Sequence, residues 1–172
     1  MKGLGIMKNR KIKKLGGGGG GFTLIEVVLV LAIGGLIFLL AFVAFQNAST
    51  NRRDTQRRND VNRMVSEVQN YASDHNSAIP TAAVAGNAGS GGSGTNFNQF
   101  VVDYMGGANF KGPKGRVYAI GTTPAKPNNT NDGTVVYTYG SGAACDTTKT
   151  LGPKDFKIQL GLEKGTVCRD SL

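Results

Sequence analysis

The chain has 172 residues and a formal net charge of +9 at pH 7. Its length allows one modest globular domain beside a long helix and excludes two enzyme-sized domains. The charge alone suggests a nucleic-acid-binding protein, but six of the 20 basic side chains and no acidic ones lie in residues 1–21. The rest of the chain has a net charge of only about +3, which is typical of an ordinary solvated surface.

Residues 1–21 form a basic leader that ends in six consecutive glycines. Its basic residues are Lys2, Lys8, Arg10, Lys11, Lys13 and Lys14. The following run, Phe22–Phe45, contains one charged residue, Glu26. As a helix this run is about 36 Å long, enough to cross a hydrocarbon core of roughly 30 Å. The excess of Lys and Arg before the run predicts that this end stays in the cytoplasm.

The apolar run differs from the core of a cleavable secretory signal peptide. Such a core has about 7–15 apolar residues and is followed by an Ala-x-Ala cut site. The run is longer, and Ala41-Phe42-Val43-Ala44 has the wrong spacing for that site. We therefore expect the apolar segment to remain attached and to anchor the protein in a membrane.

Glu26 is a carboxylate inside a segment that otherwise belongs in lipid. A charge at the bilayer centre costs about 2.5–3.5 kcal/mol, and less near a helix end, so a partner is expected. If the chain were cut after Gly21, the freed amine of Phe22 would lie four residues before Glu26, on the same helix face. That amine could pair with Glu26 of its own chain or of a neighbouring copy. The alternative is that Glu26 lies at the membrane border and reaches water.

The basic leader, the glycines, Phe-Thr-Leu-Ile-Glu and the apolar helix together resemble the class III signal of type IV pilins and their relatives. In that family a membrane peptidase cuts after the glycine and methylates the new amino terminus. The resemblance implies that Gly21 precedes the cut, that Phe22 is the methylated terminus and that Glu26 acts in assembly. It covers residues 1–50 closely.

The same resemblance implies a location and a set of partners. The precursor would be a single-pass protein of the inner (cytoplasmic) membrane, and the mature chain would form an extracellular homopolymeric filament. The partners would be the prepilin peptidase and methyltransferase, and then the pilus assembly platform with its ATPase machinery.

A single helix is expected over residues 22–76, with 22–45 as the transmembrane part and the filament core. Its second half has an amphipathic pattern in which apolar residues recur at spacings of three and four. The apolar positions are Val61, Met64, Val65, Val68, Tyr71 and Ala72. Polar residues between them are predicted on the outer face: Arg57, Arg58, Asp60, Asn62, Arg63, Glu67 and Asp74.

The remaining residues, 77–172, are expected to form the globular domain. Residues 81–95 are poor in apolar side chains and predict a flexible loop, although they contain a bare G-x-G-x-x-G string. A short helix is expected at Phe97–Met105, capped by Thr95 or Asn96 and ended by two glycines. Four strand-like runs are expected to form strands: 116–122, 134–139, 156–162 and 166–169.

The expected fold class is α+β and type IV pilin-like: a long N-terminal helix, half transmembrane and half amphipathic, packed on a small antiparallel β-sheet. Cys145 and Cys168 both fall in the part expected outside the cytoplasm, where an oxidising compartment favours a disulfide. Two free buried thiols are the alternative. The resemblance places an αβ-loop at 81–115 and a disulfide-closed region at the C-terminus on the outer surface.

The sequence contains no motif that predicts an enzyme, a metal or a cofactor. The sole histidine, His75, is expected to be a polar residue at the helix end. The expected function is that of a structural subunit, the major pilin, of a filament used in adhesion, twitching motility or DNA uptake. Alternatives are a minor pilin or a type II secretion pseudopilin, which share the N-terminal pattern.

A DNA-binding competence pilin is a further alternative, ranked below a solvated surface. Its candidate contacts are the basic residues of the C-terminal part: Lys111, Lys114, Arg116, Lys149, Lys154, Lys157 and Arg169. Phosphate binding by several such residues weakens steeply with salt. A membrane-tethered enzyme ranks last because no catalytic motif supports it.

Overall fold

The computed structural model describes residues 21–172. The predicted leader therefore lies outside the described residues except for Gly21. The chain divides into two units, one through Val43 and one from Ala44 to Leu172. The architecture is an α+β fold resembling that of type IV pilins, with a long N-terminal helix packed on a small, mostly antiparallel sheet.

Helix α1 (Leu24–Asp74) confirms the long N-terminal helix, with two residues fewer at each end than predicted. It ends before Asn76 and Ser77, which both have positive φ angles and turn the chain away. The part of α1 in the first unit is apolar apart from Glu26, and all of its residues are exposed. Among the described residues, it is the stretch long and apolar enough to cross a membrane, which is consistent with a single-pass membrane protein.

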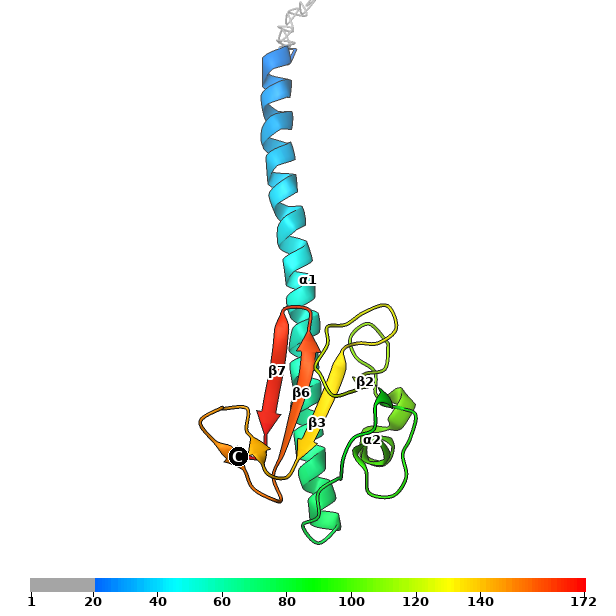
Figure 1. Cartoon of the computed structure of the whole chain (residues 1–172). Coiled ribbons are helices and arrows are strands. Elements are labelled where there is room, and N and C mark those ends of the chain that lie inside the picture. The colour runs from blue at the N-terminus through cyan, green and yellow to red at the C-terminus, as the bar shows by residue number, and fades with distance from the viewer. Residues whose placement is uncertain (1–20) are drawn as a thin grey trace, which may run out of the picture. The chain divides into compact units, whose positions relative to one another are not determined.

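The second half of α1 belongs to the compact unit that runs from Ala44 to Leu172, the globular unit. This half of the helix is part of the globular unit because its apolar stripe is buried in the core: Val61, Met64, Val68 and Tyr71. In Figure 1 this half lies behind β3 (Thr134–Tyr139), β6 (Phe156–Leu162) and β7 (Gly165–Asp170). The core side chains of β6 alternate as a half-buried strand requires: Phe156, Ile158 and Leu160.

The sheet has five strands in the order β1-β2-β3-β6-β7. The predicted strands at 134–139, 156–162 and 166–169 are confirmed, and β6 and β7 form a hairpin. The prediction of a seven-residue strand at 116–122 was wrong, because β2 is only Ala119–Ile120. Beyond β2 the chain loops back, and the carbonyl of Ala125 accepts the N–H of Thr134 at the start of β3 at 3.0 Å.

Strand β2 pairs in parallel with β3, so the sheet is mostly but not entirely antiparallel. Strand β1 (Gly86–Asn87) lies within the predicted flexible loop and pairs with β2. That loop is tethered, since the side chain of Asn98 accepts the N–H of Val84 at 2.8 Å and donates to its carbonyl at 2.9 Å. The G-x-G-x-x-G string there lies in a loop with turns and bends, and no βαβ unit surrounds it in the part that the structure describes.

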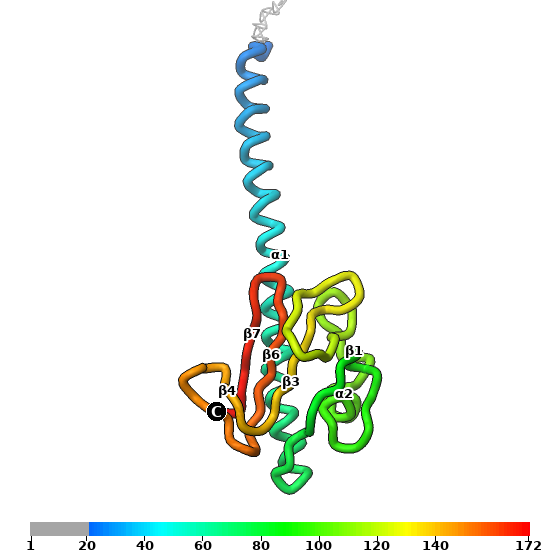
Figure 2. Tube along the Cα trace, in the orientation of Figure 1, coloured from blue at the N-terminus to red at the C-terminus, as the bar shows by residue number. Residues whose placement is uncertain are grey.

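Helix α2 (Phe97–Met105) has the predicted bounds and caps. The Asn96 side chain accepts the N–H of Gln99, and Gly106 ends the helix with a φ of 87°. A 3₁₀ turn, η1 (Gly107–Asn109), follows. Two further short strands, β4 (Gly142–Ala143) and β5 (Thr150–Leu151), form a separate ribbon. Figure 2 shows β4 close to the C-terminus and the β7 edge of the sheet.

Candidate functional site

The predicted assembly residue, Glu26, lies in the first turn of α1. Its carboxylate accepts hydrogen bonds from the backbone N–H of Thr23 at 3.1 Å and from the Thr23 hydroxyl at 2.9 Å. In return, the N–H of Glu26 donates to Oγ1 of Thr23 at 3.3 Å. This reciprocal pattern is a capping box, with Thr23 as N-cap and Glu26 at the third helical position.

The capping box gives Glu26 a second role that our sequence interpretation missed. The signal was present, because Thr23-x-x-Glu26 is the spacing of a capping box. The carboxylate also interacts favourably with the positive end of the helix dipole. Through these bonds the carboxylate is held toward the start of the helix, at Thr23. The other predicted processing residue, Phe22, is 86 % exposed.

The apolar side chains after Glu26 have no cover within the described chain. Residues 21–48 are all exposed, including the large ones from Val27 to Phe45. Soluble monomers rarely expose apolar patches of more than a few hundred Å². This surface therefore requires either lipid or other apolar helices around it.

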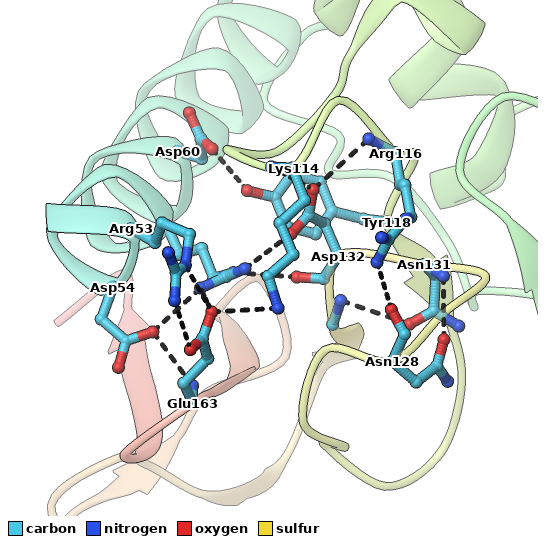
Figure 3. Close-up of polar contacts among 12 residues, drawn as sticks. Arg53, Asp54, Asp60, Lys114, Arg116, Tyr118, Asn128, Asn131, Asp132 and Glu163 are labelled. Carbon is cyan, nitrogen blue, oxygen red and sulfur yellow. Dashed lines mark hydrogen bonds and ion pairs between the residues drawn. The ribbon is translucent and has the colours of Figure 1, made fainter. Parts of the chain in front are cut away.

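The second notable site is a buried ion network in the globular unit, shown in Figure 3. At its centre is Arg57, whose side chain is fully buried. Its guanidinium donates to Oδ1 of Asp132 at 2.6 Å and to the Asp132 carbonyl at 3.0 Å. It also donates to Asp54 at 3.0 Å and to Glu163 at 3.3 Å. The prediction that Arg57 lies on the outer face was wrong.

The carboxylates around Arg57 also hold backbone from distant segments. Asp54 accepts the N–H groups of Glu163 and Lys164, both at 3.0 Å, and so fixes the turn of the β6–β7 hairpin on α1. Asp132 accepts the N–H of Lys114 at 2.8 Å. Because no buried side-chain polar atom among the described residues lacks a partner, the burial of these charges is compensated.

Glu163 closes the network at the hairpin turn. It binds Arg53 through two hydrogen bonds of 2.7 and 3.0 Å, and Lys114 lies 3.2 Å away. These cations, with the hydrogen bond from Arg53 first, lower the pKa of Glu163 to about 2. The carboxylate therefore stays charged well below neutral pH.

Asp60 was also predicted on the outer face, but it is half-buried and accepts the hydroxyl of Tyr118. Burial raises the pKa of Asp60 and that of the Tyr118 hydroxyl. The spacing of residues along the helix could not show these contacts. Tyr118, the partner of Asp60, and Asp132, the partner of Arg57, come from segments about 60–75 residues further along the chain.

Cys145 and Cys168 form a disulfide, as predicted. The bond joins β7 to the segment after β4, and the carboxylate of Asp170 accepts the N–H of Cys145 at 2.7 Å. His75 follows the end of α1 and stacks on Tyr71 with ring centroids 3.9 Å apart. Its Nδ1 lies 2.9 Å from the Tyr71 carbonyl, which fits the predicted polar helix-end role.

The candidate DNA contacts are dispersed, and several already have partners within the chain. Lys114 lies beside Glu163, and Arg116 donates to the carbonyl of Asn128. Lys157 donates to the Ala143 carbonyl at 2.8 Å, and Arg169 donates to Asn62 at 3.1 Å. These contacts give no support to the DNA-binding alternative.

No family model, curated protein or solved structure matches the chain.

Proposed function

We propose that this chain is the structural subunit, and specifically the major subunit, of an extracellular type IV pilus. A prepilin peptidase would cleave the precursor after Gly21, and the new Phe22 terminus would be methylated. The observation that carries the proposal is the apolar run that begins with Phe-Thr-Leu-Ile-Glu, which no other part of the described chain covers from residue 22 to residue 45.

The mechanism follows from that surface. In the precursor the apolar helix lies in the inner membrane, and the basic leader holds its start in the cytoplasm. Cleavage removes this basic segment and creates an amine beside Glu26. When the assembly platform extracts the subunit, neighbouring apolar helices replace the lipid. The Glu26 carboxylate then pairs with the Phe22 amine of an adjacent subunit, which sets the register between copies.

Two variants separate the assembly role of Glu26 from its capping role. Glu26→Gln removes the charge but keeps a side chain that a capping box accepts. Thr23→Ala removes the cap but keeps the carboxylate. We expect Glu26→Gln to abolish or strongly reduce filaments while cleavage after Gly21 continues, and Thr23→Ala to reduce filament yield less. Filament yield is measured by shearing and quantifying surface filaments, and cleavage by mass spectrometry of the N-terminus.

Wild-type filament yield from Glu26→Gln would overturn the role in assembly. Equal losses of filament yield in the two variants would mean that Glu26 acts only as a helix cap. Native protein that retains residues 1–21 and is never found in filaments would overturn the proposed function as a whole. Abundance separates the major pilin from a minor pilin or a pseudopilin, because the major subunit dominates purified filaments by mass.

A further inference from the structure

Two tripeptides in the chain have the pattern Asn-x-Ser/Thr with no proline in the middle. They are Asn47-Ala48-Ser49 and Asn128-Asn129-Thr130. This pattern is the acceptor signal for transfer of a glycan to the asparagine side chain. A tripeptide alone is a weak signal, so the local structure of each copy decides whether it can act as an acceptor.

The side chain of Asn128 has its oxygen and its nitrogen in different surroundings. Oδ1 accepts the N–H of Thr130 at 2.8 Å, the hydroxyl of Thr130 at 2.8 Å and the N–H of Asn131 at 2.9 Å. None of these bonds uses Nδ2, and residues 128–130 are exposed. The nitrogen that would receive a glycan is thus on the surface, while the oxygen is held by three donors.

The turn that carries Asn128 is fixed in the folded protein. The N–H of Asn128 donates to the carbonyl of Asn131 at 3.1 Å, and Arg116 donates to the carbonyl of Asn128. Asn131 in turn accepts the N–H of Gly133 at 3.2 Å, next to the buried Asp132. Figure 3 shows Asn128 and Asn131 close to Arg116 and Asp132. The acceptor is therefore presented without any unfolding of the globular unit.

The first tripeptide lies in a different environment. Asn47 and Ser49 are inside α1, and the hydroxyl of Ser49 accepts a hydrogen bond from Arg53 at 2.7 Å. Asn47 also comes two residues after Phe45, the end of the apolar run. Presentation of this tripeptide in a turn requires the helix to unwind next to the membrane. It serves as an internal control with the same pattern and a helical backbone.

We propose that Asn128 is a glycan acceptor whose donor is a saccharide joined through its anomeric carbon to a polyprenyl diphosphate. The three donors on Oδ1 stabilise the negative charge that this oxygen gains when Nδ2 gives a proton to a base of the transferase. Nδ2 then attacks the anomeric carbon and forms the N–C bond. The bond from that carbon to the phosphate oxygen breaks, and its electron pair leaves with the diphosphate.

The inference depends on the proposed function in one respect. The globular unit must reach the outer side of the membrane, where a transferase of this class can act on the folded turn. Assembly into a filament is not required. The role assigned to Thr130 is specific, because its hydroxyl and N–H both donate to Oδ1 of Asn128. A serine at this position keeps both donors, and an alanine keeps one.

The test is mass spectrometry of the full chain expressed in and purified from its own source cells. The tryptic peptide 117–149 reports on Asn128, and the peptide that contains Asn47 is measured in the same digest. We expect a saccharide mass on Asn128 in the wild type and in Thr130→Ser, and its loss in Asn128→Gln and in Thr130→Ala. Asn47→Gln should leave the modification unchanged. An unmodified Asn128, or a saccharide found on Asn47 in its place, overturns the inference.

The N-terminus of the same sample reports on the proposed function separately. An unmodified Asn128 on protein that begins at Phe22 and forms filaments overturns the glycan acceptor alone. A modified Asn128 on protein that never forms filaments overturns the proposed function as a pilus subunit and supports the assignment of Asn128 as a glycan acceptor. An unmodified Asn128 on protein that retains its leader overturns both.

Discussion

Replacement of Arg57 with methionine tests whether the buried ion network holds the globular unit on α1. The change keeps most of the aliphatic stem and removes the guanidinium with its four hydrogen bonds to Asp54, Asp132 and Glu163. Asp132, which is fully buried, then loses the cation that neutralises it. Removal of one partner from a buried pair costs about 3–5 kcal/mol.

The expected result is a large decrease in the midpoint of thermal unfolding. For a domain of this size, 3–5 kcal/mol corresponds to roughly 10–20 °C. The assay is near-ultraviolet circular dichroism of the full chain in detergent, which follows the tertiary packing of the globular unit. The matched control is Arg58→Met, the adjacent and exposed arginine, for which we expect a change within about 0.5 kcal/mol.

A second substitution identifies why Arg57→Met lowers the stability of the globular unit. If the uncompensated charge of Asp132 dominates, the double variant Arg57→Met/Asp132→Asn should recover part of the stability, because the charge is removed and an acceptor for the N–H of Lys114 remains. The reasoning would be refuted if Arg57→Met were within 1 kcal/mol of the wild type. It would also be refuted if Arg58→Met were equally damaging.

Two further predictions concern the same region of the fold. The pKa of Glu163 falls from 4.5 to about 2 on folding, so its contribution to stability is complete above pH 4.5 and is lost as the pH falls toward 2. The unfolding midpoint of the wild type should therefore drop more steeply between pH 4.5 and 2 than that of Glu163→Gln, and parallel curves would contradict this. Gly161→Ala should destabilise by about 1–3 kcal/mol, because a Cβ there would lie 2.0 Å from the carbonyl oxygen of Ala125. Gly142→Ala is the control, since no atom lies within 4 Å of its Cβ position, and similar denaturation midpoints for the two variants would show that the close approach does not matter.

Local patterns were sufficient for most of the secondary structure. Helix α2 was predicted with its N-cap and its terminating glycine, because caps depend on residues within one turn of the helix end. Strands β3 and β6 were predicted with their observed bounds from alternating apolar residues. The disulfide followed from the two cysteines and the expected compartment.

The sequence by itself determined the long helix, its apolar first half and the buried stripe of its second half, because these depend on residues three and four positions apart. Only the tertiary structure decided the partners of Arg57, the parallel pairing of β2 and the tethering of residues 81–95. Each of these depends on contacts between segments far apart in the chain. Arg57 has the spacing of the buried stripe, four residues before Val61, but its charge predicted exposure. Its burial is possible because Asp132 and Glu163 come to it from more than 70 residues away.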